Sequence, residues 1–69
     1  MNQINFSQTQ TSRLLKASEI AEMLNISRAF AYKLMKQGEI PTVQIGGAVR
    51  VRPDDLQNYI QQNISSSEY

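Results

Sequence analysis

Cysteine, histidine and tryptophan are all absent from this 69-residue chain. Without cysteine and histidine there can be no disulfide bond and no zinc site built from those ligands, which are common supports of very small folds. The longest apolar runs are only a few residues, so the sequence predicts no membrane-spanning helix. Residues 1–5 have neither a basic stretch nor an apolar core, and so they show no secretory signal. We expect a small, soluble, cytoplasmic protein.

The short length also bears on the class of function. A chain of this size forms one domain and buries only about 60% of the surface that its unfolded form exposes, which argues against a deep enzyme pocket. The adjacent carboxylates Asp54 and Asp55 could suggest catalysis or a metal, but they follow Pro53 at a predicted helix start, where the helix dipole favours negative charge. No nucleophile–base pair accompanies them. We therefore expect no enzymatic activity, no cofactor and no metal site.

Polar ends flank a mildly basic centre. Residues 1–12 carry no charge and are rich in Asn, Gln, Ser and Thr, so we expect a flexible arm there and a disordered tail at residues 65–69. The folded unit is then residues 13–64, which contain all seven basic residues and five of the six acidic ones. This small excess does not by itself indicate nucleic-acid binding, so the placement of the charges has to decide.

Two short helices are predicted in the first half of the unit. Residues 18–24 place Ile20, Ala21 and Leu24 on one face, and either Lys16 or Ser18 is the N-cap. Leu14–Leu15, just before, is a possible short strand.

The second helix is predicted at residues 28–37. Asn25 tolerates the left-handed conformation that ends a helix, and Ser27 is a good N-cap for the next one. Gly38 followed by Pro41 is a helix-ending signature.

The second predicted helix has an apolar side and a cationic side. Helical spacing gathers Ala31, Leu34 and Met35 on one side, and opposite them lie Arg28, Ala29, Tyr32, Lys33 and Lys36. These charges could be an ordinary solvated face. However, no acidic residue shares the helix, so the Glu–Lys pairs that are typical of such faces cannot form within it. Tyr32 is either a half-buried aromatic or a phosphate contact, and we expect Phe30 to be a core or partner contact.

A β-hairpin and a third helix follow. Gly46–Gly47 separates two alternating β-branched runs, which predicts a hairpin over residues 43–51. Alternation puts Arg50 and Arg52 on one strand face, where they contact a ligand or protect a strand edge. The last helix starts at Pro53, and its expected apolar stripe is Leu56, Tyr59, Ile60 and Ile64.

This order of elements predicts a mostly α fold with a small β-hairpin wing, a winged helix-turn-helix. The second helix (27–37) would be a recognition helix in a DNA major groove, because small residues at its start let it approach base edges and Arg28 can bind a guanine edge with two hydrogen bonds. The hairpin (43–51) would be a wing on the neighbouring backbone. The candidate DNA-binding residues are Ser27, Arg28, Ala29, Tyr32, Lys33, Lys36, Gly46, Gly47, Arg50 and Arg52.

Residues 15–60 resemble the excisionase and MerR-like winged helix-turn-helix family. The shared marks, in order, are Ala21 with Leu24, Asn25-Ile26-Ser27-Arg28, Tyr32-Lys33-Leu34-Met35, Gly38-Glu39-Ile40-Pro41, Ile45-Gly46 and Val49-Arg50-Val51. The resemblance implies that Ser27, Arg28, Tyr32 and Lys33 belong to the recognition helix, and that Gly46, Gly47 and Arg50 belong to the wing. Many relatives have basic residues where this chain has Gly47 and Ala48, and often a small residue where it has Phe30.

The same resemblance implies two roles. One is an excisionase-like recombination directionality factor, and the other is a small transcriptional regulator. MerR proteins continue into a coiled coil and an effector domain, whereas this sequence stops, so we expect the excisionase type. The implied partner is double-stranded DNA in the nucleoid, together with an integrase or recombinase or further copies of the chain. The alternative is a small protein-interaction adaptor anchored by Phe30 and Tyr32.

Overall fold

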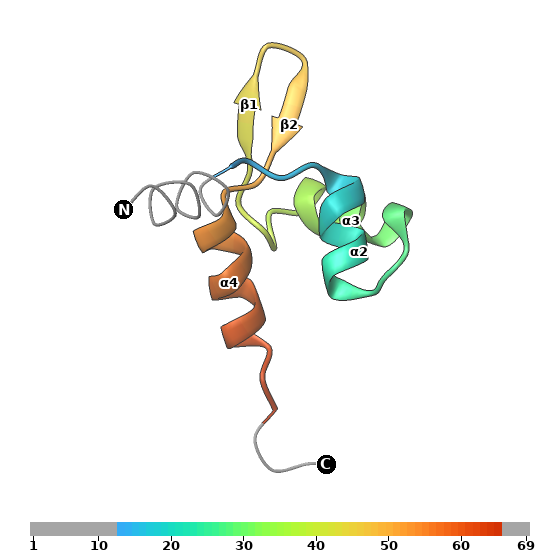
Figure 1. The fold of residues 1–69 in the computed structure, drawn as a ribbon, viewed down its shortest axis with the longest axis vertical. Coiled ribbons are helices and arrows are strands. Elements are labelled where there is room, and N and C mark those ends of the chain that lie inside the picture. The colour runs from blue at the N-terminus through green and yellow to red at the C-terminus, as the bar shows by residue number, and fades with distance from the viewer. Residues whose placement is uncertain (1–12, 66–69) are drawn as a thin grey trace, which may run out of the picture.

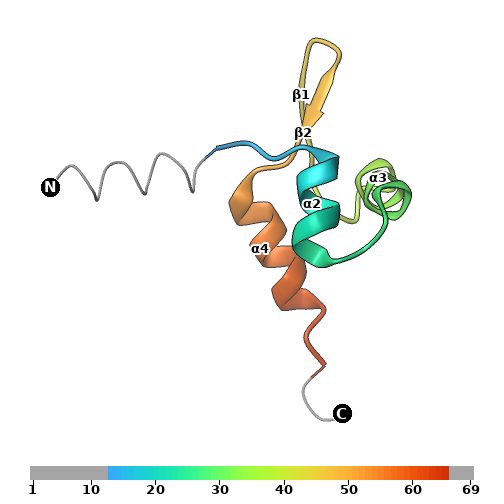
Figure 2. The same ribbon diagram turned by 45° about the vertical axis from the view of Figure 1, so that its right-hand side comes forward.

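The computed structural model describes residues 13–65. Its elements, in chain order, are the helices and strands α2 (Ala17–Leu24), α3 (Arg28–Lys36), β1 (Val43–Ile45), β2 (Ala48–Arg50) and α4 (Pro53–Gln62). The hairpin projects from one end of the molecule and α4 runs toward the other end (Figure 1). Helices α2 and α3 lie next to each other in both views, with α4 to one side of them (Figure 1 and Figure 2). The predicted winged helix-turn-helix is confirmed. The predicted arm (1–12) and the last four residues of the predicted tail (66–69) lie outside the described residues.

One apolar core joins the three helices to the base of the hairpin. The apolar side predicted for α3 is confirmed, since Ala31, Leu34 and Met35 are all buried. No described helix is long and apolar enough to cross a membrane. The buried residues of the core are Leu15, Ala17, Ile20, Ala21, Ala31, Leu34, Met35, Ile40, Val51 and Leu56.

Local signals mark both ends of α2 and the start of α3. The Lys16 backbone N–H donates to Glu19 Oε1 at 2.8 Å, so Lys16 holds the N-cap position and α2 starts one residue before the predicted boundary. Asn25 ends the helix with a left-handed φ of 59°, as predicted. The Ser27 Oγ then accepts from the Phe30 N–H at 3.0 Å, which confirms the predicted N-cap of α3.

A buried isoleucine fixes the far end of α3. The helix ends at Lys36, one residue earlier than predicted, and Gly38 takes a positive φ of 80°. The backbone N–H groups of Glu39 and Ile40 both donate to the Leu34 carbonyl, at 2.9 and 3.3 Å. Ile40 itself is completely buried. Because Ser27 caps one end and Ile40 anchors the other, the exposed side of α3 is held in a defined orientation.

The hairpin is antiparallel, with Val43 opposite Arg50, Gln44 opposite Val49 and Ile45 opposite Ala48. Gly46 supplies the positive φ of 59° that the turn needs. At the base of the hairpin, Leu15 and Val51 exchange backbone hydrogen bonds of 2.8 and 2.9 Å. The possible strand at Leu14–Leu15 is therefore present as a single bridge.

Two sequence-based expectations about the last third of the chain are wrong. Strand β2 ends at Arg50, and Arg52 is the N-cap of α4, so Arg50 and Arg52 do not share a strand face. The strand stops because Val51 pairs with Leu15 instead of continuing the hairpin. Ile64 is not part of the apolar stripe of α4, because the helix ends at Gln62 and the Ile64 side chain is 60% exposed. Leu56 is buried, and Tyr59 and Ile60 pack against the core as expected.

Candidate nucleic-acid interface

The exposed side of α3 is the largest gathering of basic residues on one element. Its apolar side is buried against the core, so the remaining side chains must point outward. The exposed residues are Arg28, Ala29, Phe30, Tyr32, Lys33 and Lys36, and Ser27 at the cap is exposed as well. The structure therefore brings six of the ten predicted site residues together at this helix.

The ion pairs within residues 13–65 do not involve the cations of α3. Within residues 13–65 there are two salt bridges, Arg13 to Glu19 at 2.9 Å and Arg52 to Asp55 at 2.7 Å. Among the described carboxylates, none lies within 4.0 Å of the charged groups of Arg28, Lys33 or Lys36. The positive field of α3 is therefore not cancelled by a contacting acid.

The two carboxylates in these ion pairs, Glu19 and Asp55, have lowered pKa values. The pKa of Glu19 is lowered, first by the hydrogen bond from the Lys16 backbone N–H and then by Arg13. The Arg52 guanidinium donates two hydrogen bonds to the Asp55 carboxylate, at 2.7 and 3.0 Å, and these hold the pKa of Asp55 below its usual range. Arg52 is thus occupied in fixing the first turn of α4.

The two faces of the wing differ in what they present. Strand alternation and the observed register put Gln44 and Val49 on one face, and Val43, Ile45, Ala48 and Arg50 on the other. The face that carries Gln44 and Val49 opens toward α3, since both residues help to line a hollow between the wing and that helix. The complete lining of this hollow is Tyr32, Met35, Lys36, Thr42, Gln44 and Val49.

The predicted wing residues do not join the surface of α3. Arg50 lies on the face of the hairpin opposite Gln44, and its side chain donates to the Val49 carbonyl at 3.0 Å. Gly46 and Gly47 form the turn at the tip of the hairpin. Arg52, outside the strand, faces Asp55. The wing is therefore a separate positive element, not an extension of the α3 surface.

Sequence reasoning missed Thr42 and Gln44. Neither is among the candidate DNA-binding residues, although strand alternation with the turn centred on Gly46–Gly47 places Gln44 across from Val49. The signal was present in the sequence. Strand alternation does not predict where the hairpin lies relative to α3, because the packing of the core decides that position.

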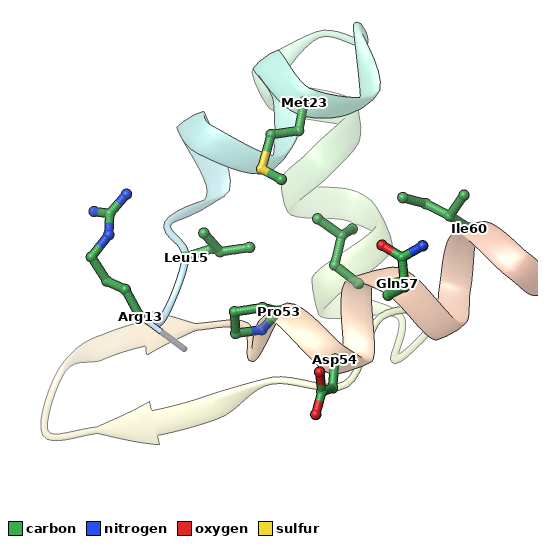
Figure 3. Close-up of a pocket in the computed structure, with 8 residues that line it drawn as sticks. Arg13, Leu15, Met23, Pro53, Asp54, Gln57 and Ile60 are labelled. Atoms are coloured by element: carbon green, nitrogen blue, oxygen red, sulfur yellow. The ribbon is translucent and has the colours of Figure 1, made fainter. Parts of the chain in front are cut away.

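A second hollow lies between α2 and α4 (Figure 3). Apolar residues form most of its lining, and Met23 from α2 faces Gln57 and Ile60 from α4 across it. Arg13 and Asp54 stand at its edge, and Met23 is 61% exposed. Within the described part of the chain, no group of three or more His, Cys, Asp or Glu residues is placed to hold a metal ion.

The aromatic side chains of α3 do not form one patch. Phe30 is 46% exposed and Tyr32 is 56% exposed. Their separation of two positions puts them on different flanks of the helix, because only residues three or four apart share a helical face. Tyr32 borders the hollow beside the wing, whereas Phe30 does not line it.

Comparisons with known proteins agree with this geometry. Residues 14–64 match a family described as "Helix-turn-helix domain", and this range includes every helix and strand of the described fold. Two Mycobacterium tuberculosis proteins, from strains CDC 1551 / Oshkosh and ATCC 25618 / H37Rv, are each 28% identical to this chain over 54 residues. The match covers 78% of this chain and 69% of each relative, and both relatives are named "Putative DNA-binding protein". No solved structure matches the chain. The resemblance to the excisionase-like proteins is confirmed, and the chain belongs to the helix-turn-helix domain family.

Proposed function

We propose that this protein binds double-stranded DNA in a sequence-specific manner, with α3 in the major groove and the wing (43–51) against the neighbouring backbone. One observation carries the proposal. The apolar side of α3 is locked into the core, while its outer side presents Arg28, Lys33 and Lys36 with no carboxylate of the described chain in contact. The names of the two mycobacterial relatives support the same function.

The roles within α3 follow from distance along the helix. Ser27, Arg28 and Ala29 lie at its start, where the Ser27 cap and the small Ala29 allow close approach to base edges. Arg28 is assigned to a guanine edge, because its guanidinium can donate two parallel hydrogen bonds. Tyr32, Lys33 and Lys36 lie further along and are assigned to phosphates.

The wing makes a second, weaker contact. Gly46 and Gly47 at the tip let the main chain approach the DNA, and Arg50 reaches the backbone from the outer face of the hairpin. Arg52 belongs to the same candidate set, but it must release Asp55 before it can bind a phosphate. We therefore expect Arg52 to contribute least.

A single domain of this kind binds weakly. Of its seven basic residues, two are in ion pairs within residues 13–65 and Arg28 is assigned to a base edge, which leaves four cations for phosphates. If all four took part, the logarithm of the binding constant would fall with the logarithm of salt concentration with a slope of about −3.6. Useful occupancy then requires several copies on adjacent sites, or a partner such as an integrase or recombinase. We place the protein in the nucleoid as an excisionase-like directionality factor or a small transcriptional regulator.

The test is a binding titration with fluorescent duplexes. The full chain is first used to select its preferred sequence from a random pool, and affinities are then measured between 50 and 200 mM salt. Arg28→Ala is expected to cost about 1–3 kcal/mol and to relax the preference at one base pair, whereas Lys36→Ala weakens all duplexes alike. Absence of salt-dependent binding by the natural protein would refute DNA binding. Equal, sequence-independent losses from both variants would refute the assigned roles.

Phe30→Ala is the matched control for the adaptor alternative. Since Phe30 lies on a flank of α3 away from the hollow beside the wing, its removal should leave DNA affinity within twofold. Binding to a protein partner that is indifferent to salt and lost in Phe30→Ala would support an adaptor instead.

A further inference from the structure

The hollow between α3 and the wing combines one cation with three neutral hydrogen-bond donors. Lys36 supplies an ammonium group, Tyr32 and Thr42 supply hydroxyls, and Gln44 supplies an amide. The other two lining residues are apolar: Met35 is buried and Val49 is half-buried. No Asp or Glu is part of this lining. Such a set of groups suits an anion with several acceptor oxygens.

The donors come from α3 on one side of the hollow and from β1 and the residue before it on the other. Tyr32 and Lys36 are four residues apart on α3 and so share a helical face. Gln44 is in β1 opposite Val49, and Thr42 is two residues before it, immediately ahead of the strand. The link between α3 and β1 is anchored by Ile40, which is completely buried. The backbone on both sides of the hollow is therefore attached to the core, through Met35 in α3 and Ile40 before β1.

We propose that this hollow holds one phosphate of the DNA backbone, and that Thr42 and Gln44 are DNA-contacting residues. The proposal rests on the DNA binding proposed above, because the bound strand must pass between the recognition helix and the wing. Lys36 provides the charge, while the hydroxyls of Tyr32 and Thr42 and the Gln44 amide donate to phosphate oxygens. These neutral donors position the strand between helix and wing but release no counterion.

This division of roles gives two different salt signatures. Thr42→Val keeps the shape of the side chain but removes the hydroxyl, and should lower affinity on the order of 10-fold at every salt concentration, without changing the salt slope. Lys36→Ala should lower affinity and also reduce the slope by about 0.9. A change of slope in Thr42→Val, or no loss of affinity, would overturn the assignment of Thr42.

A pair of charge variants tests which face of the wing contacts the phosphate. Gln44→Glu puts a carboxylate into the hollow, whereas Ile45→Glu puts the same charge one residue away on the opposite face, where Ile45 is 56% exposed. We expect a loss on the order of 100-fold for Gln44→Glu and a loss about tenfold smaller for Ile45→Glu, whose face makes only the Arg50 contact with the backbone. Equal losses would show a general repulsion and refute a phosphate site in the hollow.

A scan of the DNA itself uses the unaltered protein. Single neutral methylphosphonates are placed in turn along the selected duplex. At one position the loss should be smaller in Thr42→Val than in the natural protein, because the hydroxyl contact to that phosphate is already gone, while the contact from Lys36 is still lost. If the losses are additive at every position, the inference fails while DNA binding stands. If the natural protein binds no duplex, the proposed function fails as well.

Discussion

Residue 47 at the tip of the wing offers a direct test of whether the wing approaches DNA. A Cβ added at Gly47 would meet no atom within 4 Å, and its backbone is outside the left-handed region that Gly46 occupies with a φ of 59°. A lysine is therefore expected to fit at this position without strain. Gly47→Lys adds a basic residue at the tip of the hairpin, between Gly46 and Ala48.

The size of the effect follows from counterion release. The substitution raises the formal net charge from +1 to +2. One additional phosphate contact steepens the salt slope by about 0.9, so the gain in affinity over the natural protein should shrink by about 3.5-fold between 50 and 200 mM salt. The expected signature is thus tighter binding at low salt with a benefit that fades as salt rises.

Anisotropy titrations on one duplex measure this signature. Gly47→Gln is the neutral control of similar length, and Gly47→Glu should weaken binding with the opposite trend. Gly46→Lys adds the same charge one residue earlier but forces a side chain into the left-handed region, at a cost of about 1–2 kcal/mol in stability. If Gly47→Lys and Gly47→Gln bind equally at every salt concentration, the wing tip does not approach the DNA and the docking arrangement is wrong.

Two further predictions concern the framework that presents α3. Ser27→Ala removes the N-cap that accepts from the Phe30 N–H, and should destabilise the fold by about 1 kcal/mol, lowering Tm by about 4–8 °C. Thermal melts should show little change for Ser18→Ala, an exposed control, and equal melting of the two variants would contradict a capping role. The lowered pKa values of Glu19 and Asp55 mean that the folded state holds these carboxylates ionised more strongly than the unfolded chain does. Their contribution is therefore present above about pH 4 and is lost as pH falls through the folded-state values. Below pH 4, the Tm of the natural protein should fall more steeply with pH than the Tm of the double variant Glu19→Gln/Asp55→Asn. Parallel plots of Tm against pH for the two proteins would contradict this.

Most of the helix-turn-helix could be predicted because its signals are local. Asn25 at a helix end, Ser27 at a cap and Gly38 beyond the last turn each act through hydrogen bonds or dihedral angles within a few residues. The periodicity of α3 likewise identified its buried side, since apolar spacing reports which side must leave water. The observed helices differ from the predicted ranges by one residue at the start of α2 and by one residue at the end of α3.

The wing and its surroundings could not be predicted in the same way. Arg52 was expected on a strand, but the pairing of Val51 with Leu15 ends the strand, and Asp55 captures the guanidinium. Ile64 has the spacing of a core residue, yet α4 ends before it. The end of the strand depends on Leu15, a residue far away in the sequence, and the end of α4 is not marked by any change in apolar spacing.

The sequence by itself determined the order of the elements, the Ser27 cap and the basic side of α3, because short-range dihedral preferences, hydrogen bonds and apolar spacing decide these features. Tertiary packing alone decided which face of the wing turns toward α3. Burial of Ile40 and Val51 in a shared core sets that orientation, and it brings Gln44 to the hollow beside Lys36 while leaving Arg50 on the far face. A strand pattern specifies two faces but not which one meets a neighbour, since that choice depends on the apolar surface contributed by all the helices together.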